Sequence, residues 1–189
     1  MRRSSPGTFG QRTCPGVTVA RVSHTLGEMT LDDFTKRQLQ RVVEEGRQLA
    51  RIEQDTSTPR RRVLLVGPPG TRKTTAAAAL SGELGLPLIA VQFDALVAAH
   101  TDSSAGKLGH LLDAVASIRG VYCIDGFDAP TAQSAPPNDA AAVQRLLNRF
   151  LRVIQQHHAS SLVVVVSHHQ SGPPDWAEAV HFDDVIEMH

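Results

Sequence analysis

A glycine-rich turn that joins an apolar strand to an alanine-rich helix constrains this chain more than any other feature of its sequence. Residues 63–66 are all apolar, residues 67–74 read Gly-Pro-Pro-Gly-Thr-Arg-Lys-Thr, and a helical pattern runs from about Lys73 to Leu84. At such a turn, backbone N–H groups and the helix N-terminus face an anion. This context favours a phosphate-binding loop over a structural turn with an incidental lysine.

The residues of this turn suit a nucleotide with its metal ion. Lys73 would reach the β- and γ-phosphates, and the Thr74 hydroxyl would bind Mg²⁺. We therefore expect ATP and Mg²⁺ as ligands, with the nucleotide held by Pro68, Pro69, Gly70, Thr71, Arg72, Lys73, Thr74 and Thr75. Arg72 departs from the usual pattern, which has glycine before the lysine. Glycine permits the closest approach of backbone to phosphate, so the arginine could either crowd the site or add a favourable charge.

Apolar runs and helical patterns alternate through the rest of the body. Further strands are expected at 88–93, 121–124, 162–166 and 184–188, and helices at about 107–118 and 143–154. Strands that are apolar throughout are typical of sheets with helices on both faces. The alternation predicts an α/β fold with a parallel sheet.

The chain divides into three predicted regions. Residues 1–29 mix Ser, Pro, Gly, Thr and Arg without periodicity, so we expect a mostly disordered basic arm. Residues 30–59 hold an amphipathic helix and a linker, and Thr30 with an acid three residues later resembles a helix start. Residues 60–189 form the nucleotide-binding core.

Composition excludes several classes of protein. No stretch approaches about 18 consecutive apolar residues, so no membrane span is expected. Cys14 and Cys123 are too few for a disulfide framework, which favours a cytoplasmic location. The basic arm could contact nucleic acid, but a solvated segment explains it better, and we expect no nucleic-acid partner.

Three later segments extend the pattern begun at 63–93. Residues 121–129 read Val-Tyr-Cys-Ile-Asp-Gly-Phe-Asp-Ala, residues 161–168 read Ser-Leu-Val-Val-Val-Val-Ser-His, and residues 182–187 read Phe-Asp-Asp-Val-Ile-Glu. Together these segments resemble the AAA+ family of ring-forming P-loop ATPases, and most of all the bacterial stand-alone members. The resemblance implies a three-layer sandwich around a parallel five-stranded sheet of order 5-1-4-3-2.

The resemblance also assigns roles, some to unusual residues. Asp125 matches the aspartate that holds Mg²⁺ together with Thr74, whereas Gly126 stands where the family has its catalytic glutamate. His168 matches the polar sensor-1 residue. Val180 and His181 stand where the family has its paired arginines.

Two further family features differ. His100 lies where a pore-loop aromatic is expected, and no helical lid follows the last strand before residue 189. The resemblance thus implies a domain that binds Mg²⁺-nucleotide but hydrolyses it weakly or not at all, and that assembles with identical or different AAA subunits. The alternatives are an active ATPase that remodels a partner protein, and a scaffold subunit that binds no nucleotide. A small-molecule P-loop kinase fits the chain length, but the segments at 121–129 and 182–187 argue against it.

Overall fold

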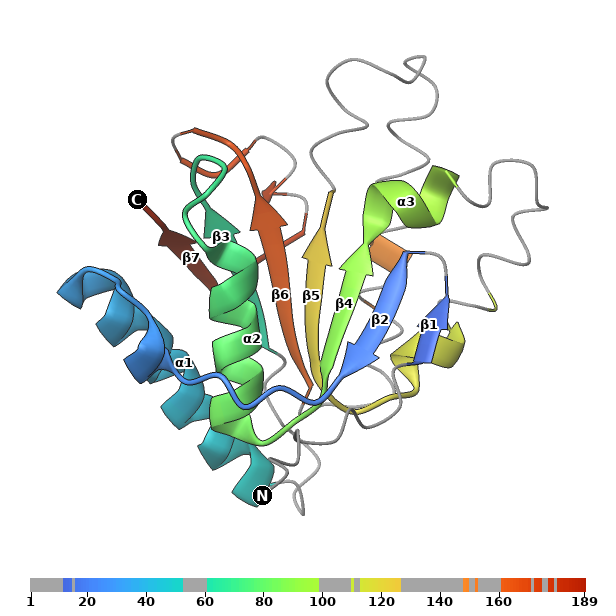
Figure 1. Ribbon diagram of the computed structural model, residues 1–189, viewed down its shortest axis with the longest axis horizontal. Coiled ribbons are helices and arrows are strands. Elements are labelled where there is room, and N and C mark those ends of the chain that lie inside the picture. Colours follow the sequence, from blue (N-terminus) through green and yellow to red (C-terminus); the bar gives the residue numbers. More distant parts are fainter. Residues whose placement is uncertain are drawn as a thin grey trace, which may run out of the picture.

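The computed structural model describes the strands and most of the helices that frame the turn. The described residues are 12–14, 16–52, 61–98, 110, 113–126, 148, 149, 152, 161–170, 172–174, 177, 178 and 180–189. Within them, a seven-stranded sheet has the order β1-β2-β4-β5-β6-β3-β7. Helices α1 and α2 lie over one face of this sheet (Figure 1).

Five strands of the sheet are parallel: β3 (Arg61–Val66), β4 (Leu88–Gln92), β5 (Val121–Asp125), β6 (Leu162–Ser167) and β7 (Asp184–Glu187). From the β7 edge inward, these strands follow the order 5-1-4-3-2 that the family resemblance implied. Their carboxyl ends meet at one edge, where α3 (Phe93–Ala98) also begins (Figure 1). Ligands of open α/β sheets bind outside this edge.

Two antiparallel strands extend the sheet beyond β4. β1 (Arg12–Cys14) pairs with β2 (Val17–Ala20), and β2 pairs with β4, with Val17 opposite Val91. A short 3₁₀ helix, η1 (Leu26–Glu28), follows. The prediction of a disordered arm is therefore wrong for residues 12–14 and 16–29, because Val17 gains burial from a partner strand distant in the sequence. Residues 1–11 lie outside the described residues.

The apolar strands are buried on both faces, as their composition predicts. Along β6, Val163 and Val165 contribute to one core cluster, and Val164 and Val166 to the other. The second cluster is covered by α1 (Asp33–Ile52) and α2 (Lys73–Leu84). None of the helices in the described part of the chain has the length and apolarity to cross a bilayer.

The start of α1 differs from the expected one by two residues. Asp32, rather than Thr30, caps the helix, because its Oδ1 accepts bonds from the backbone N–H groups of Phe34 (3.0 Å) and Thr35 (2.9 Å). Hydrogen bonds from the side chain and backbone of Thr35 hold the pKa of Asp32 below its ordinary value. Of the helices expected near 107–118 and 143–154, the described positions 110, 113–116, 148, 149 and 152 are helical, and the rest lie outside the described residues.

Candidate functional site

The glycine-rich turn leaves β3 at the carboxyl edge of the sheet and closes against the end of β7. The Met188 backbone N–H donates to the Val66 carbonyl at 2.7 Å. A Cβ placed on Gly67 would lie 2.1 Å from the Met188 carbonyl oxygen. Only glycine allows the backbone to pass this closely. The strand β7 therefore fixes the path by which the chain enters the turn.

Lys73, the first residue of α2, is held at the centre of the turn. Its side chain is only 3% exposed. The ammonium donates to the carbonyl oxygens of Gly67 and Pro68, each at 2.7 Å, and to the Thr71 hydroxyl at 3.0 Å. The Thr71 hydroxyl in turn donates to the Pro68 carbonyl at 3.0 Å. The turn thus wraps around one positive charge at the N-terminus of a helix, where an anion is favoured.

Arg72 adopts a backbone conformation that favours glycine. Its φ is 61° and its ψ is 29°, in the left-handed region, immediately before α2. Arg72 is exposed, and its carbonyl accepts the Ala76 N–H at 2.9 Å. The expectation of glycine at this position therefore has a conformational basis. A non-glycine residue in this region costs about 1–2 kcal/mol.

Thr74, Asp125 and His168 come together from three elements. The Thr74 hydroxyl donates to Asp125 Oδ2 at 3.3 Å, across the gap between α2 and the end of β5. Asp125 Oδ1 accepts the Gly126 N–H at 2.7 Å and lies 3.1 Å from His168 Nε2. A hydroxyl and a carboxylate oxygen, exposed beside an anion-binding turn, are donors that suit Mg²⁺, which keeps several waters and shares substrate phosphates.

Gly126 is packed against a carboxylate that the sequence reasoning missed. Its φ is +77°, and a Cβ built on it would lie 2.4 Å from Oδ1 of Asp94 and 2.8 Å from the Asp94 Cγ. Asp94 follows β4, the strand beside β5, near the start of α3. Its sequence signal is faint, because it is one acid just beyond an apolar strand.

Val180 and His181, which stand where the family has its paired arginines, have different surroundings from each other. Val180 is 1% exposed and joins the core, and its carbonyl accepts a hydrogen bond from the Arg62 guanidinium. His181 is exposed and has a φ of 55°. Arg149, at a described helical position, lies 3.9 Å from Asp113 in an exposed ion pair. His100 lies outside the described residues.

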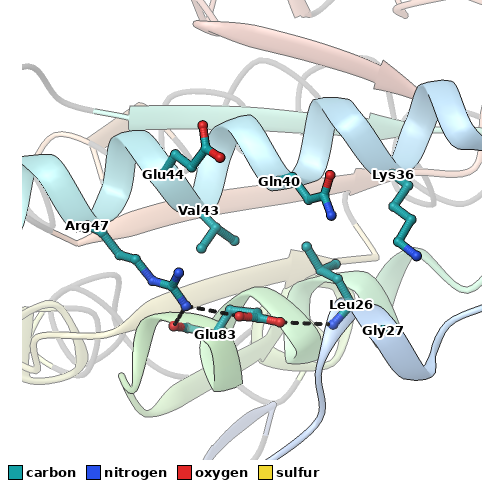
Figure 2. Close-up of a pocket in the computed structure, with 8 residues that line it drawn as sticks. All are labelled: Leu26, Gly27, Lys36, Gln40, Val43, Glu44, Arg47 and Glu83. Atoms are coloured by element: carbon teal, nitrogen blue, oxygen red, sulfur yellow. Dashed lines mark hydrogen bonds and ion pairs between the residues drawn. The ribbon is translucent and has the colours of Figure 1, made fainter.

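A hollow lies between η1, α1 and α2 on the helical face of the sheet. A cavity of about 400 Å³ is lined by Leu26, Gly27, Lys36, Gln40, Val43, Glu44, Arg47 and Glu83 (Figure 2). Arg47 bonds the Glu83 carboxylate at 3.0 Å, and Glu83 also accepts the Leu26 N–H at 3.4 Å. Glu83 lies ten residues along α2 from Lys73, about 15 Å at the helical rise. The cavity is therefore separate from the turn.

A family model and several known proteins are similar to this chain. The family model "ATPase family associated with various cellular activities (AAA)" matches residues 63–188. An uncharacterized AAA family ATPase, y4kL, of Sinorhizobium fredii is 28% identical over 131 residues, which are 69% of this chain and 40% of that protein. The ribosome biogenesis ATPase RIX7 of Saccharomyces cerevisiae is 36% identical over 93 residues, 49% of this chain and 11% of that protein.

A solved structure shows the same fold. The structure of C. elegans PCH-2 has a TM-score of 0.62 at 15% identity, and the match covers 90% of this chain and 48% of that chain. This chain thus spans less than half the length of each of these relatives.

Proposed function

Because the chain belongs to the AAA family of ATPases, we propose that it binds Mg²⁺-ATP at the turn formed by residues 67–74 and hydrolyses it weakly or not at all. One observation carries the binding half of this proposal. Lys73, Thr74 and Asp125 meet at the carboxyl edge of the sheet, with the Thr74 hydroxyl 3.3 Å from the Asp125 carboxylate. The lysine would bind the β- and γ-phosphates, and Thr74 with Asp125 would hold the metal ion.

Two replacements support slow hydrolysis. Gly126 has no carboxylate to position the attacking water, and the loss of such a group costs about 10²–10⁴ in rate. Val180 is buried and uncharged, and a missing arginine finger costs about 10³–10⁵. Phosphoryl transfer depends on charge neutralisation, so the two losses together leave turnover near background. Bound nucleotide would then act as a structural ligand or a switch.

We also propose that the chain assembles with AAA subunits in the cytoplasm, since AAA proteins typically form oligomers. Sedimentation of the protein with and without Mg²⁺-ATP would measure assembly with identical subunits, and an unchanged monomer in both conditions contradicts that form of assembly.

Equilibrium binding of a fluorescent ATP analogue tests the site. The wild-type chain should bind it in Mg²⁺, and Lys73→Ala should weaken binding about 10–100-fold, because one charged hydrogen-bonding group is lost. Lys36→Ala is the matched control, since this lysine lines the separate cavity (Figure 2). Phosphate release measured in parallel should stay near the rate without protein.

Two other outcomes identify the alternatives. Steady phosphate release that Lys73→Ala abolishes would show an active ATPase, of the kind that could remodel a partner protein. No nucleotide binding by the folded wild-type chain would show a scaffold subunit.

A further inference from the structure

We propose that the Asp94 carboxylate takes the place of the acid missing at position 126 and orients the water that attacks the γ-phosphate. This inference rests on the proposed function, because it requires nucleotide at the turn of residues 67–74. It adds a residue that the family resemblance does not assign, and it makes the residual slow turnover depend on Asp94.

The packing around Gly126 carries the inference. A side chain at position 126 would begin where the Asp94 carboxylate now lies, since the Cβ position is 2.4 Å from Asp94 Oδ1 and 2.8 Å from its Cγ. Glycine at position 126 therefore makes room for the Asp94 carboxylate. The carboxylate fills the volume in which an acid at position 126 would start.

The strand register places Asp94 beside the metal-site acid. Gln92, the last residue of β4, is paired with Asp125, the last residue of β5. Asp94 lies two residues beyond Gln92, at the same edge of the sheet, and packs on the residue after Asp125. Its exposed carboxylate accepts no hydrogen bond from any other described residue. The oxygens are thus available to a water molecule.

The chemistry requires only a positioned acceptor. Asp94 would accept a hydrogen bond from the water, whose oxygen forms a bond to the γ-phosphorus. The bond from that phosphorus to the β–γ bridging oxygen breaks, and its electron pair leaves with ADP. The proton released by the water passes to the Asp94 carboxylate and then to solvent, so ATP and water give ADP and phosphate.

Two phosphate analogues separate positioning of water from binding of nucleotide. ADP with beryllium fluoride imitates bound ATP, whereas ADP with aluminium fluoride imitates the in-line arrangement of the attacking water. Asp94→Asn should bind ATP and ADP–beryllium fluoride within about twofold of wild type. It should bind ADP–aluminium fluoride at least tenfold more weakly than the wild-type chain does.

Asp113→Asn is the matched control, because it makes the same change in an exposed ion pair with Arg149. Asp94→Ala, checked for folding by circular dichroism, should repeat the selective loss. Equal loss of both analogues, or unchanged binding of aluminium fluoride, overturns the role of Asp94 and leaves the proposed function standing. A wild-type chain that binds no nucleotide overturns both.

Discussion

The hydroxyl of Thr74 lies 3.3 Å from Oδ2 of Asp125, although 51 residues separate them in the chain. Asp125 Oδ1 is held on its other side by the Gly126 N–H at 2.7 Å and by His168 Nε2 at 3.1 Å. The carboxylate is therefore oriented by the end of its own strand and by the loop after β6. The Oδ2 atom faces Thr74, the second residue of α2, and this spacing of two oxygens suits two ligands of one cation.

Asp125→Asn should uncouple nucleotide binding from magnesium. The amide oxygen can still accept the Gly126 N–H, so the fold is retained, but the negative charge opposite the cation is lost. We expect the gain in ATP affinity between EDTA and Mg²⁺ to fall by about 10-fold or more. Titration of a fluorescent ATP analogue at several Mg²⁺ concentrations measures this gain. Asp183→Asn, at a carboxylate that bonds the Arg62 backbone, serves as the control. An unchanged magnesium dependence would remove Asp125 from the metal site.

Arg72→Gly should stabilise the chain. The wild-type residue has a φ of 61°, which costs a non-glycine residue about 1–2 kcal/mol, whereas glycine loses about 0.5–1 kcal/mol more entropy on folding. The net gain in the free energy of unfolding should be about 0.5–1 kcal/mol, measured by urea denaturation. Arg72→Ala removes the side chain and keeps the strain, so it should show no such gain. Equal gains in the free energy of unfolding in both variants would mean that the arginine side chain, and not the backbone conformation, destabilises the wild-type chain.

The same pair of variants shows how Arg72 affects the binding of nucleotide. Tighter ATP binding in both variants would mean that the arginine side chain crowds the phosphates. Weaker binding in both would mean that its charge helps. A change in the glycine variant alone would place the effect in the backbone of the turn.

The positions of the five parallel strands could be predicted because they follow from local signals. Each strand is a short apolar run, and the turn after Val66 marks the first of them. Their arrangement came from the family resemblance, and the sheet confirms it. The proximity of Thr74 to Asp125 follows, because the amino end of α2 and the carboxyl end of β5 lie at the same edge of the sheet.

Contacts between segments far apart in the chain could not be predicted from the sequence. β2 gains its stability by pairing Val17 with Val91, and no local periodicity in a four-residue strand reveals that partner. Asp94 meets Gly126 for the same reason, since the parallel pairing of β4 with β5 brings them together. The conformation of Arg72 could not be predicted either. The sequence shows that the arginine departs from the motif, but it does not show that the position has a positive φ.

Gly126→Glu alone should fail to create a competent site. The new Cβ would meet Asp94 Oδ1 at 2.4 Å, and the residue would have to hold a φ of +77°. We expect a loss of at least about 1 kcal/mol in the free energy of unfolding and no faster phosphate release. Gly126→Glu combined with Asp94→Ala removes the clash and should recover part of the lost stability. Wild-type stability in the single variant would contradict this account of the packing.

Cys123 should resist thiol reagents in the folded protein. Burial, with a smaller contribution from the charge of Asp125, raises the pKa of its thiol to about 12. In a Cys14→Ser background, Ellman's reagent at pH 8 should react with Cys123 only after addition of denaturant, because the thiolate is the reactive form.

The raised pKa of Cys123 also determines how the free energy of unfolding changes with pH. Above pH 9 the unfolded chain loses this proton and the folded chain keeps it, so stability falls by about 1 kcal/mol per pH unit until the folded thiol titrates. Cys123→Ala should flatten that slope between pH 9 and 11, and an equal slope in both chains would assign it to other groups.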